Sequence, residues 1–159
     1  MDNVRFTLNQ YKTTSILPPS LWQRPEIGKD YFNRQVGLAK AKRLEVQRIF
    51  LLKKGCKYDH DAIRRVVTMH KGSKLNVKFV EVDSREDFED FVIFRNYGVI
   101  HAPKLGAAMW QGLEQEKSPE AIWEAVRDGT ARFYSLSHPD AVRCKDLFEK
   151  LMLRDEIRL

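Results

Sequence analysis

Four histidines are the residues with which this sequence could carry out acid–base chemistry: His60, His70, His101 and His138. His101 is the strongest candidate for a general base, because it ends a short apolar segment and open α/β sheets bind ligands at strand ends. No orienting carboxylate or nucleophile is identifiable for it in the sequence. We therefore expect a satisfied or solvated histidine, and a small hydrolase using His101 remains an alternative. His138 precedes a helix-opening Pro139, which favours a capping role.

Acidic residues cluster at Glu86, Asp87, Glu89 and Asp90. Paired carboxylates can hold Mg²⁺ or share a proton. Their order fits no standard Ca²⁺ loop, and they precede an apolar segment that reads as a strand. We expect a solvated turn that discourages pairing at the sheet edge, and no metal site.

The two cysteines, Cys56 and Cys144, form no Cys-x-x-Cys motif and are interpreted as structural thiols. The sequence also lacks the Gly-rich patterns GxGxxG and GxxxxGK[ST], since Gly55 stands alone in its basic loop. We therefore expect no cofactor.

Basic residues provide the best candidates for ligand binding. The net charge is +6, yet residues 31–81 hold 13 basic and 4 acidic residues, a net +9, whereas residues 82–120 sum to −4. Such a basic face attracts anionic groups over long range. The expected ligand- or anion-binding residues are Lys53, Lys54, Arg64, Arg65 and His101. An alternative is nucleic-acid binding through the basic face of residues 40–78, although no aromatic–basic pattern of a nucleic-acid motif is present.

The elements that must position these residues follow from the hydrophobic pattern. A strand over 46–52, a helix capped by Asp59 and a strand over 75–80 predict a βαβ unit with parallel strands. Gly72 is expected at the end of that helix. A helix over 29–43 precedes the unit.

The second half of the chain predicts a hairpin and further helices. The expected elements are a strand over 91–94, a turn over 95–98, a strand over 99–101, a fifth short strand over 107–110, a helix capped by Ser118 and stopped by Gly129, a strand over 132–136 and a helix from Pro139. The expected buried stripe of the last helix is Val142, Leu147, Phe148, Leu151 and Met152. The fold class is α/β, with a mixed β-sheet and flanking helices.

The length and composition of the chain indicate its domain organisation. The chain has 159 residues, 43% hydrophobic and 31% charged, which is typical of a soluble globular domain. We expect residues 1–28 to form an irregular segment that packs on the domain, and residues 29–159 to form a single α/β domain. No apolar run approaches the ~20 residues of a membrane span. The first ten residues, MDNVRFTLNQ, lack the apolar core of a signal peptide, so we expect a cytoplasmic protein.

The order of elements from residue 29 onward resembles a half-repeat of the phospholipase D-like fold. The segments that carry the resemblance are VQRIFLL (46–52), HKG (70–72) before LNVKFV (75–80), DFVIF (90–94) before GVIH (98–101), and DLFE (146–149) in the last helix. The resemblance implies a central hairpin formed by the third of these segments.

Active members of that family carry a histidine nucleophile, a lysine two positions later and an aspartate five further on. In this sequence the positions become Phe88, Asp90 and Arg95, and shifting the alignment by one gives Glu89, Phe91 and Asn96. Neither set matches. The resemblance therefore implies a non-catalytic sensor or adaptor that binds a partner protein or a small anionic ligand, and a homodimer is one form of such a partner.

Overall fold

The computed structural model describes residues 9–16, 44–71, 75–95, 97–126 and 131–157. Within them, six strands form one mixed sheet in the order β3-β2-β1-β4-β5-β6. The strands are β1 (Asn9–Ser15), β2 (Leu44–Lys53), β3 (Leu75–Val82), β4 (Phe91–Phe94), β5 (Gly98–His101) and β6 (Arg132–Ser135). β1, β2 and β3 are parallel, and β4, β5 and β6 are each antiparallel to the preceding neighbour in the sheet. The expected α/β class with a mixed sheet and flanking helices is confirmed.

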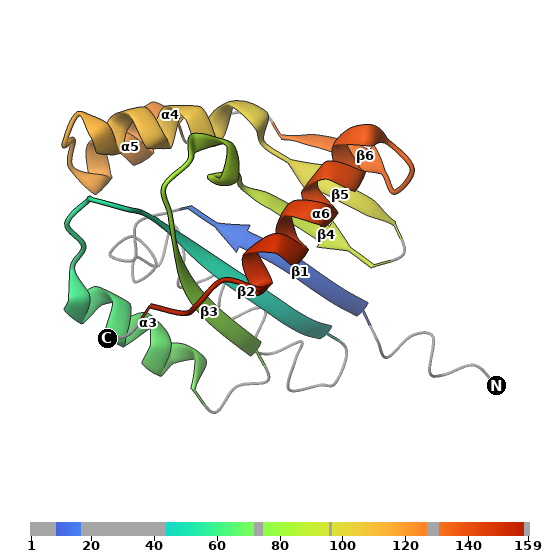
Figure 1. The fold of residues 1–159 in the computed structure, drawn as a ribbon, viewed down its shortest axis with the longest axis horizontal. Coiled ribbons are helices and arrows are strands. Elements are labelled where there is room, and N and C mark those ends of the chain that lie inside the picture. The colour runs from blue at the N-terminus through green and yellow to red at the C-terminus, as the bar shows by residue number, and fades with distance from the viewer. Residues whose placement is uncertain (1–8, 17–43, 72–74, 96, 127–130, 158–159) are drawn as a thin grey trace.

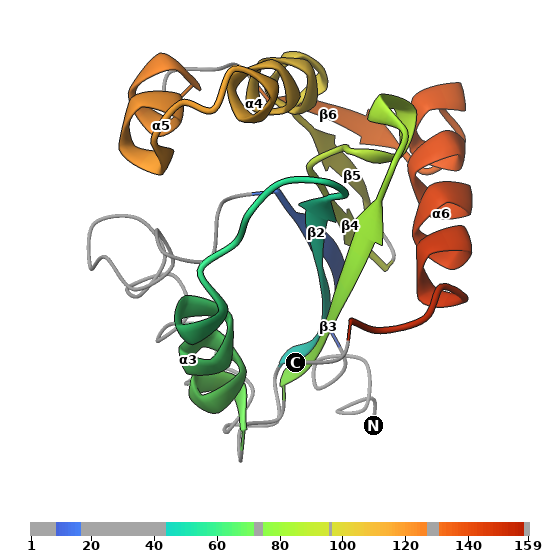
Figure 2. The same ribbon diagram turned by 60° about the vertical axis from the view of Figure 1, so that its left-hand side comes forward.

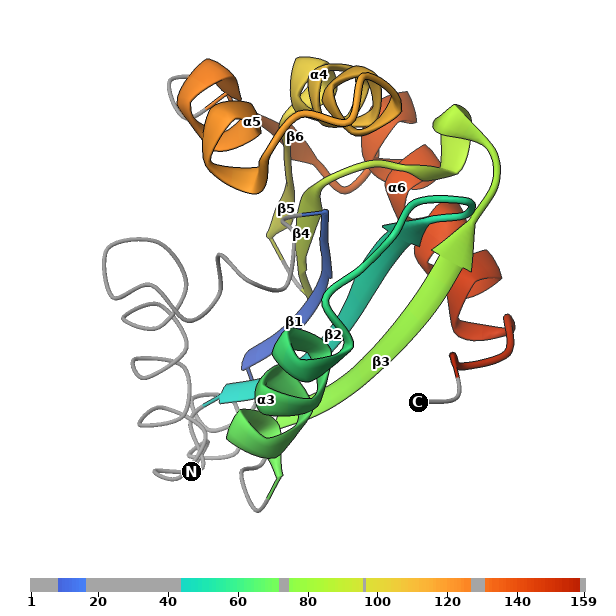
Figure 3. The same ribbon diagram turned by 90° about the vertical axis from the view of Figure 1, so that its left-hand side faces the viewer.

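Helices cover both faces of the sheet and one of its ends (Figures 1 and 2). Helix α3 (His60–His70) lies on one face and α6 (Pro139–Met152) on the other. Helices α4 (Pro103–Glu114) and α5 (Pro119–Val126) lie across the end at which β2 and β3 finish (Figure 3). Each face therefore has its own apolar core, one beneath α3 and one beneath α6, α4 and α5.

The βαβ unit forms as the hydrophobic pattern predicts. β2 pairs with β3 in parallel, and α3 connects them. Asp59 caps the helix, because its carboxylate accepts a hydrogen bond from the amide of Ala62 at 3.1 Å. Ile63 and Val66 of the helix pack beneath it on the apolar face of the sheet.

Strand β1 corrects the expectation that residues 1–28 are irregular. Asn9–Ser15 lies between β2 and β4, near the middle of the sheet. The segment lacks an apolar run, and Thr13, Thr14 and Ser15 are nevertheless buried. Both threonine hydroxyls are paired: Thr13 donates to the carbonyl of Phe91 in β4 at 3.0 Å, and Thr14 donates to the carbonyl of Glu89 just before β4 at 2.6 Å. Polar residues can therefore occupy a central strand, because β-branched threonine suits the extended backbone and its hydroxyl is paired.

The hairpin between β4 and β5 is confirmed, with Phe94 opposite Gly98. The strand expected over 107–110 is wrong, because those residues belong to α4. Pro103 occupies the first turn of that helix, where its missing N–H costs nothing, and so the residue starts a helix as well as ending β5. Gly106 sits so close to the segment that precedes β4 that an added Cβ would overlap the carbonyl oxygen of Phe88.

The remaining helices begin as expected. The Ser118 hydroxyl accepts a hydrogen bond from the amide of Ala121 at 3.2 Å, and His138 Nδ1 accepts one from the amide of Asp140 at 3.1 Å. The buried stripe of α6 is partly wrong: Val142 and Met152 are 45% and 37% exposed, and the smaller Ala141 and Cys144 are buried instead.

The helix expected over 29–43, Gly72 and Gly129 lie outside the described residues. Among the described helices, none has both the length and the apolar character needed to cross a bilayer.

Candidate functional site

The order in which the strands are added to the sheet reverses at β1. Open α/β sheets bind ligands at such a point. From β1 the chain passes to β2 and β3 on one side, and then to β4, β5 and β6 on the other. Three titratable side chains lie beside the carboxyl end of β1, because β4 begins there and β5 ends there: Glu89, Asp90 and His101.

His101 and Glu89 form a buried pair at this point. Nε2 of His101 lies 2.8 Å from Oε2 of Glu89, and the two side chains are 2% and 15% exposed. The sequence offered no orienting carboxylate for His101, yet the antiparallel hairpin places Phe91 opposite His101 and so brings Glu89 within reach. The register of the predicted β4–β5 hairpin could have identified Glu89 as the partner of His101, whereas their spacing along the sequence could not.

Helix α4 packs over this pair, since a Cβ added to its Gly106 would lie 3.5 Å from Oε2 of Glu89. Trp110 of α4 packs edge-on against Phe88, with ring centroids 5.3 Å apart, and Gly106 seats the helix against the backbone of Phe88. Met109 of the same helix is fully buried. The end of the sheet that could present His101 to a ligand is therefore filled by apolar packing.

A second buried polar group lies on the α3 face of the sheet. Nδ1 of His70 donates to the carbonyl of Val66 at 2.8 Å, which leaves Nε2 to accept from Arg48 Nη1 at 3.2 Å. Burial, with a smaller contribution from the Arg48 charge, lowers the pKa of His70 to about 4. His70 is therefore neutral at physiological pH.

Asp90 has the opposite shift. Burial raises the pKa of its carboxyl group to about 6, and the charge of Glu89 adds to the effect. A hydrogen bond from the backbone of Ile16 and the charges of His101 and Arg48 act against the rise. Asp90 thus gains or loses its charge within a mildly acidic range.

Neither cysteine supplies a nucleophile to this region. Cys144 is fully buried, and burial raises the pKa of its thiol to about 11, so the thiol stays protonated at neutral pH. Sγ of Cys56 lies 4.0 Å from the carbonyl of Leu113, at the junction of the β2 turn and α4.

The five residues predicted to bind an anion do not meet at one place. Lys53 Nζ lies 4.5 Å from the ring centroid of Trp110, and Lys54 is exposed in the turn that follows β2. Arg64 and Arg65 lie on the exposed side of α3, 3.0 Å from Asp61 and 3.9 Å from Asp59 respectively. His101 is buried on the other face of the sheet, so the structure does not bring these five residues together at one site.

Three other cations do converge. A hollow of about 230 Å³ between β1, the end of β4 and α6 is lined by Gln10, Lys12, Ile93, Arg95, Lys145 and Glu149. Lys12 forms a loose ion pair with Glu149, 3.4 Å apart, in which both side chains are exposed. Among the described residues, Arg95 and Lys145 have no ion-pair partner. Sequence reasoning missed this group because its members are far apart along the chain.

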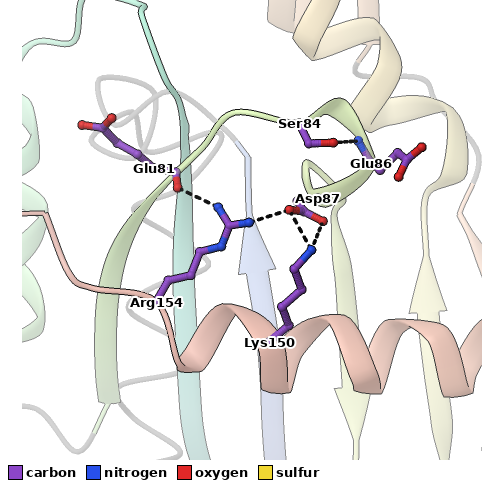
Figure 4. Close-up of polar contacts among 6 residues, drawn as sticks. All are labelled: Glu81, Ser84, Glu86, Asp87, Lys150 and Arg154. Carbon is purple, nitrogen blue, oxygen red and sulfur yellow. Dashed lines mark hydrogen bonds and ion pairs between the residues drawn. The ribbon is translucent and has the colours of Figure 1, made fainter.

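The acidic cluster is not a solvated turn throughout, which corrects the sequence expectation. Residues Arg85–Asp87 form a short 3₁₀ helix. The Asp87 side chain is 8% exposed, and its carboxylate lies between Lys150 at 3.0 Å and Arg154 at 2.7 Å (Figure 4). Glu86 alone among the four acidic residues is exposed, next to the capping hydroxyl of Ser84. In the described part of the chain, no three acidic, histidine or cysteine side chains gather closely enough to hold a metal ion.

No protein-family model matches the sequence, and no curated protein matches it significantly.

Proposed function

We propose that this chain is a non-catalytic recognition module of phospholipase D-like type that binds a small anion, or an anionic group on a partner protein. The proposed site is the hollow between β1, β4 and α6. The observation that carries the proposal is the convergence of Lys12, Arg95 and Lys145 from three separate elements on one small hollow. Among the described residues that line it, Glu149 supplies the single carboxylate.

The positions of the family's reactive residues support a role without catalysis. In the first alignment Phe88 takes the place of the motif histidine, and in the second Phe91 takes the place of the motif lysine. Both phenylalanine side chains are 1% exposed and belong to the core, so each alignment lacks one of the two reactive groups. Arg95 stands where the motif has its aspartate, and its guanidinium lines the hollow. A cation at that position suits binding of an anion, whereas it cannot orient a histidine ring by accepting its proton.

The chemistry of the hollow favours a phosphate-like dianion over a single carboxylate. The Arg95 guanidinium can bind two oxygens of one tetrahedral anion, and the lysines add point charges. Lys12 is already paired with Glu149, but that carboxylate is 68% exposed and can turn into solvent. An incoming group with two negative charges competes with Glu149 better than a monoanion does.

Calorimetric titration of the full chain with inorganic phosphate at low ionic strength tests the proposal. We expect Arg95→Glu and Lys145→Glu each to weaken binding by about tenfold or more, since each replaces an attraction with a repulsion. Glu149→Gln should tighten binding, because it removes the competing carboxylate. Lys54→Glu and Arg64→Glu are matched charge reversals outside the hollow and should change little. Binding that responds to the second pair and not to the first would place the anion site elsewhere and refute the proposal.

Nucleic-acid binding through the basic face makes a different prediction for the same variants. Its affinity for single-stranded DNA would fall steeply with salt and would depend on Lys54, Arg64 and Arg65. The ion pairs of Arg64 and Arg65 with Asp61 and Asp59 reduce the positive charge that α3 presents. Salt-dependent DNA binding that is lost on Arg64→Glu would favour this alternative over the anion hollow.

A further inference from the structure

The outer edge of β3 is covered at one place by residues 153–157, the segment that follows α6 and is called the tail below. β3 is an edge strand of the described sheet, and beyond α6 the chain turns towards it (Figure 1). The amide of Ile157 donates to the carbonyl of Phe79 at 2.9 Å, and Arg154 donates to the carbonyl of Glu81 at 3.3 Å. Residue numbers increase along the tail as they decrease along β3, so the tail runs antiparallel to the strand.

These contacts use the backbone groups that an edge strand leaves for another strand. The carbonyl of Val82 accepts from the amide of Lys54, on the side of β2. Because the direction of backbone groups alternates along a strand, those of Phe79 and Glu81 point to the outer edge. An extended segment can therefore pair here, which is how many sheets bind peptides.

A charged socket lies at one end of this edge. The Asp87 carboxylate accepts from Lys150 at 3.0 and 3.1 Å and from Arg154 at 2.7 Å (Figure 4). Lys150 belongs to α6 and Arg154 to the tail, so the socket has one fixed and one removable cation. When Arg154 leaves, Lys150 still pairs with the buried carboxylate, and release does not strand an unpaired buried charge.

A hollow with a largely apolar lining lies beside Glu81, on the α3 face of the sheet. Ile157 packs against the α3-side core and lines a surface hollow of about 430 Å³ together with Tyr58, Ile63 and Cys56. Ile157 is only half-buried there, so the hollow has space for a larger apolar side chain. The tail thus presents a basic residue and, three positions later, an apolar residue to two matching features.

From this arrangement we propose that the β3 edge is a docking site for an extended segment of a partner protein that carries a basic residue followed three positions later by an apolar one. Residues 153–157 occupy the site as an intramolecular plug. The partner displaces Arg154 from Asp87, pairs with the backbone of Phe79 and Glu81, and fills the hollow beside Tyr58. This surface is separate from the anion hollow, and the two proposals stand or fall independently.

Fluorescence anisotropy with a labelled peptide of sequence LMLRDEI, which copies residues 151–157, tests the proposal on the full chain. The unmodified chain should bind it weakly, because its own tail competes at high effective concentration. Arg154→Glu loosens the tail and leaves Asp87 intact, so we expect binding about tenfold tighter or more. Ile157→Ser should also strengthen binding. A peptide with glutamate for its arginine and serine for its isoleucine is the matched control and should not bind.

The double variant Asp87→Asn with Arg154→Glu separates docking from a general loosening of the chain. It releases the tail equally but removes the socket, so the gain in peptide affinity should disappear. Circular dichroism confirms that each variant is folded. The proposal is overturned if Arg154→Glu and Ile157→Ser both leave peptide affinity unchanged, or if the double variant binds as tightly as Arg154→Glu.

Discussion

Nε2 of His101 lies 2.8 Å from Oε2 of Glu89, and helix α4 closes over both side chains. A histidine and a carboxylate at this distance can form part of a catalytic site. Here the imidazole is 2% exposed, and the nearby Cys144 thiol has a pKa raised by burial to about 11. We interpret the pair as a hydrogen bond that fixes the β4–β5 hairpin beneath α4.

His101→Ala should therefore lower the free energy of unfolding and leave anion binding unchanged. The variant opens a cavity and removes the partner of the partly buried Glu89 carboxylate, at a cost of about 2–4 kcal/mol. Urea denaturation measures the change. His60→Ala, at the exposed start of α3, is the matched control and should cost less than about 0.5 kcal/mol. Equal small losses in both variants would contradict the structural role of the pair.

The βαβ unit could be read from the sequence because its signals are local. Asp59 caps the helix, and the strands on either side of it are apolar runs. β1 carries no such signal, since Thr13, Thr14 and Ser15 are polar, and the two threonine hydroxyls find their partners at Phe91 and Glu89, more than 70 residues away. α4 was missed because Ala107, Ala108 and Met109 fit a helix or a strand equally well as a short apolar segment.

The candidate site was harder to predict than the fold. Lys12, Arg95 and Lys145 come together only through the strand order, which places β1 beside β4 and α6 above both. The sequence instead drew attention to Arg64 and Arg65, which are neighbours in the chain but pair with acids on their own helix. Nonlocal convergence of charge has no linear signature when each element contributes one residue.

Thr14 should be essential for joining β1 to β4. Its hydroxyl donates to the carbonyl of Glu89 at 2.6 Å and accepts from the amide of Phe91 at 3.1 Å. Thr14→Val removes both bonds and leaves two backbone groups unpaired, so we expect a loss of about 2–3 kcal/mol in thermal or urea unfolding. Thr68→Val, which removes an exposed hydroxyl bond on α3, should cost under about 1 kcal/mol. Equal losses in the two variants would show that β1 does not depend on the two hydrogen bonds of Thr14.

Asp90 and His70 should have opposite effects on stability between pH 4 and 6. The Asp90 pKa is raised from 3.8 to about 6, so its contribution is full below pH 3.8 and is lost as pH rises through 6. The His70 pKa is lowered from 6.5 to about 4, so its contribution is full above pH 6.5 and is lost as pH falls through 4. The two dependences partly cancel in the unmodified chain.

Asp90→Asn removes the pH dependence of stability that the Asp90 carboxyl group contributes. Relative to the unmodified chain, the unfolding free energy of the variant should rise by about 2 kcal/mol from pH 4 to pH 6. His70→Gln should give a relative fall over the same interval. Urea denaturation at pH 4, 5 and 6 measures both, and curves parallel to that of the unmodified chain would show that neither group is perturbed.

Gly106→Ala should weaken the packing of α4 on the sheet. The new Cβ would overlap the carbonyl oxygen of Phe88, and a backbone atom cannot turn aside as a flexible side chain can. We expect a loss of about 2–4 kcal/mol, although alanine has the higher helix propensity. Ala108→Gly, on the exposed side of the same helix, should cost only about 1 kcal/mol. A stabilised Gly106→Ala variant, judged by thermal unfolding, would refute the close contact.

If the hollow between β1, β4 and α6 binds inorganic phosphate, titration at low ionic strength should shift the backbone amide resonances of the residues that line it. We expect saturable shifts at Lys12, Ile93, Arg95 and Lys145, with those of Lys54 and of α3 unchanged. Saturable shifts confined to Lys54 and α3, or no saturable shift at low ionic strength, would contradict the proposed anion site.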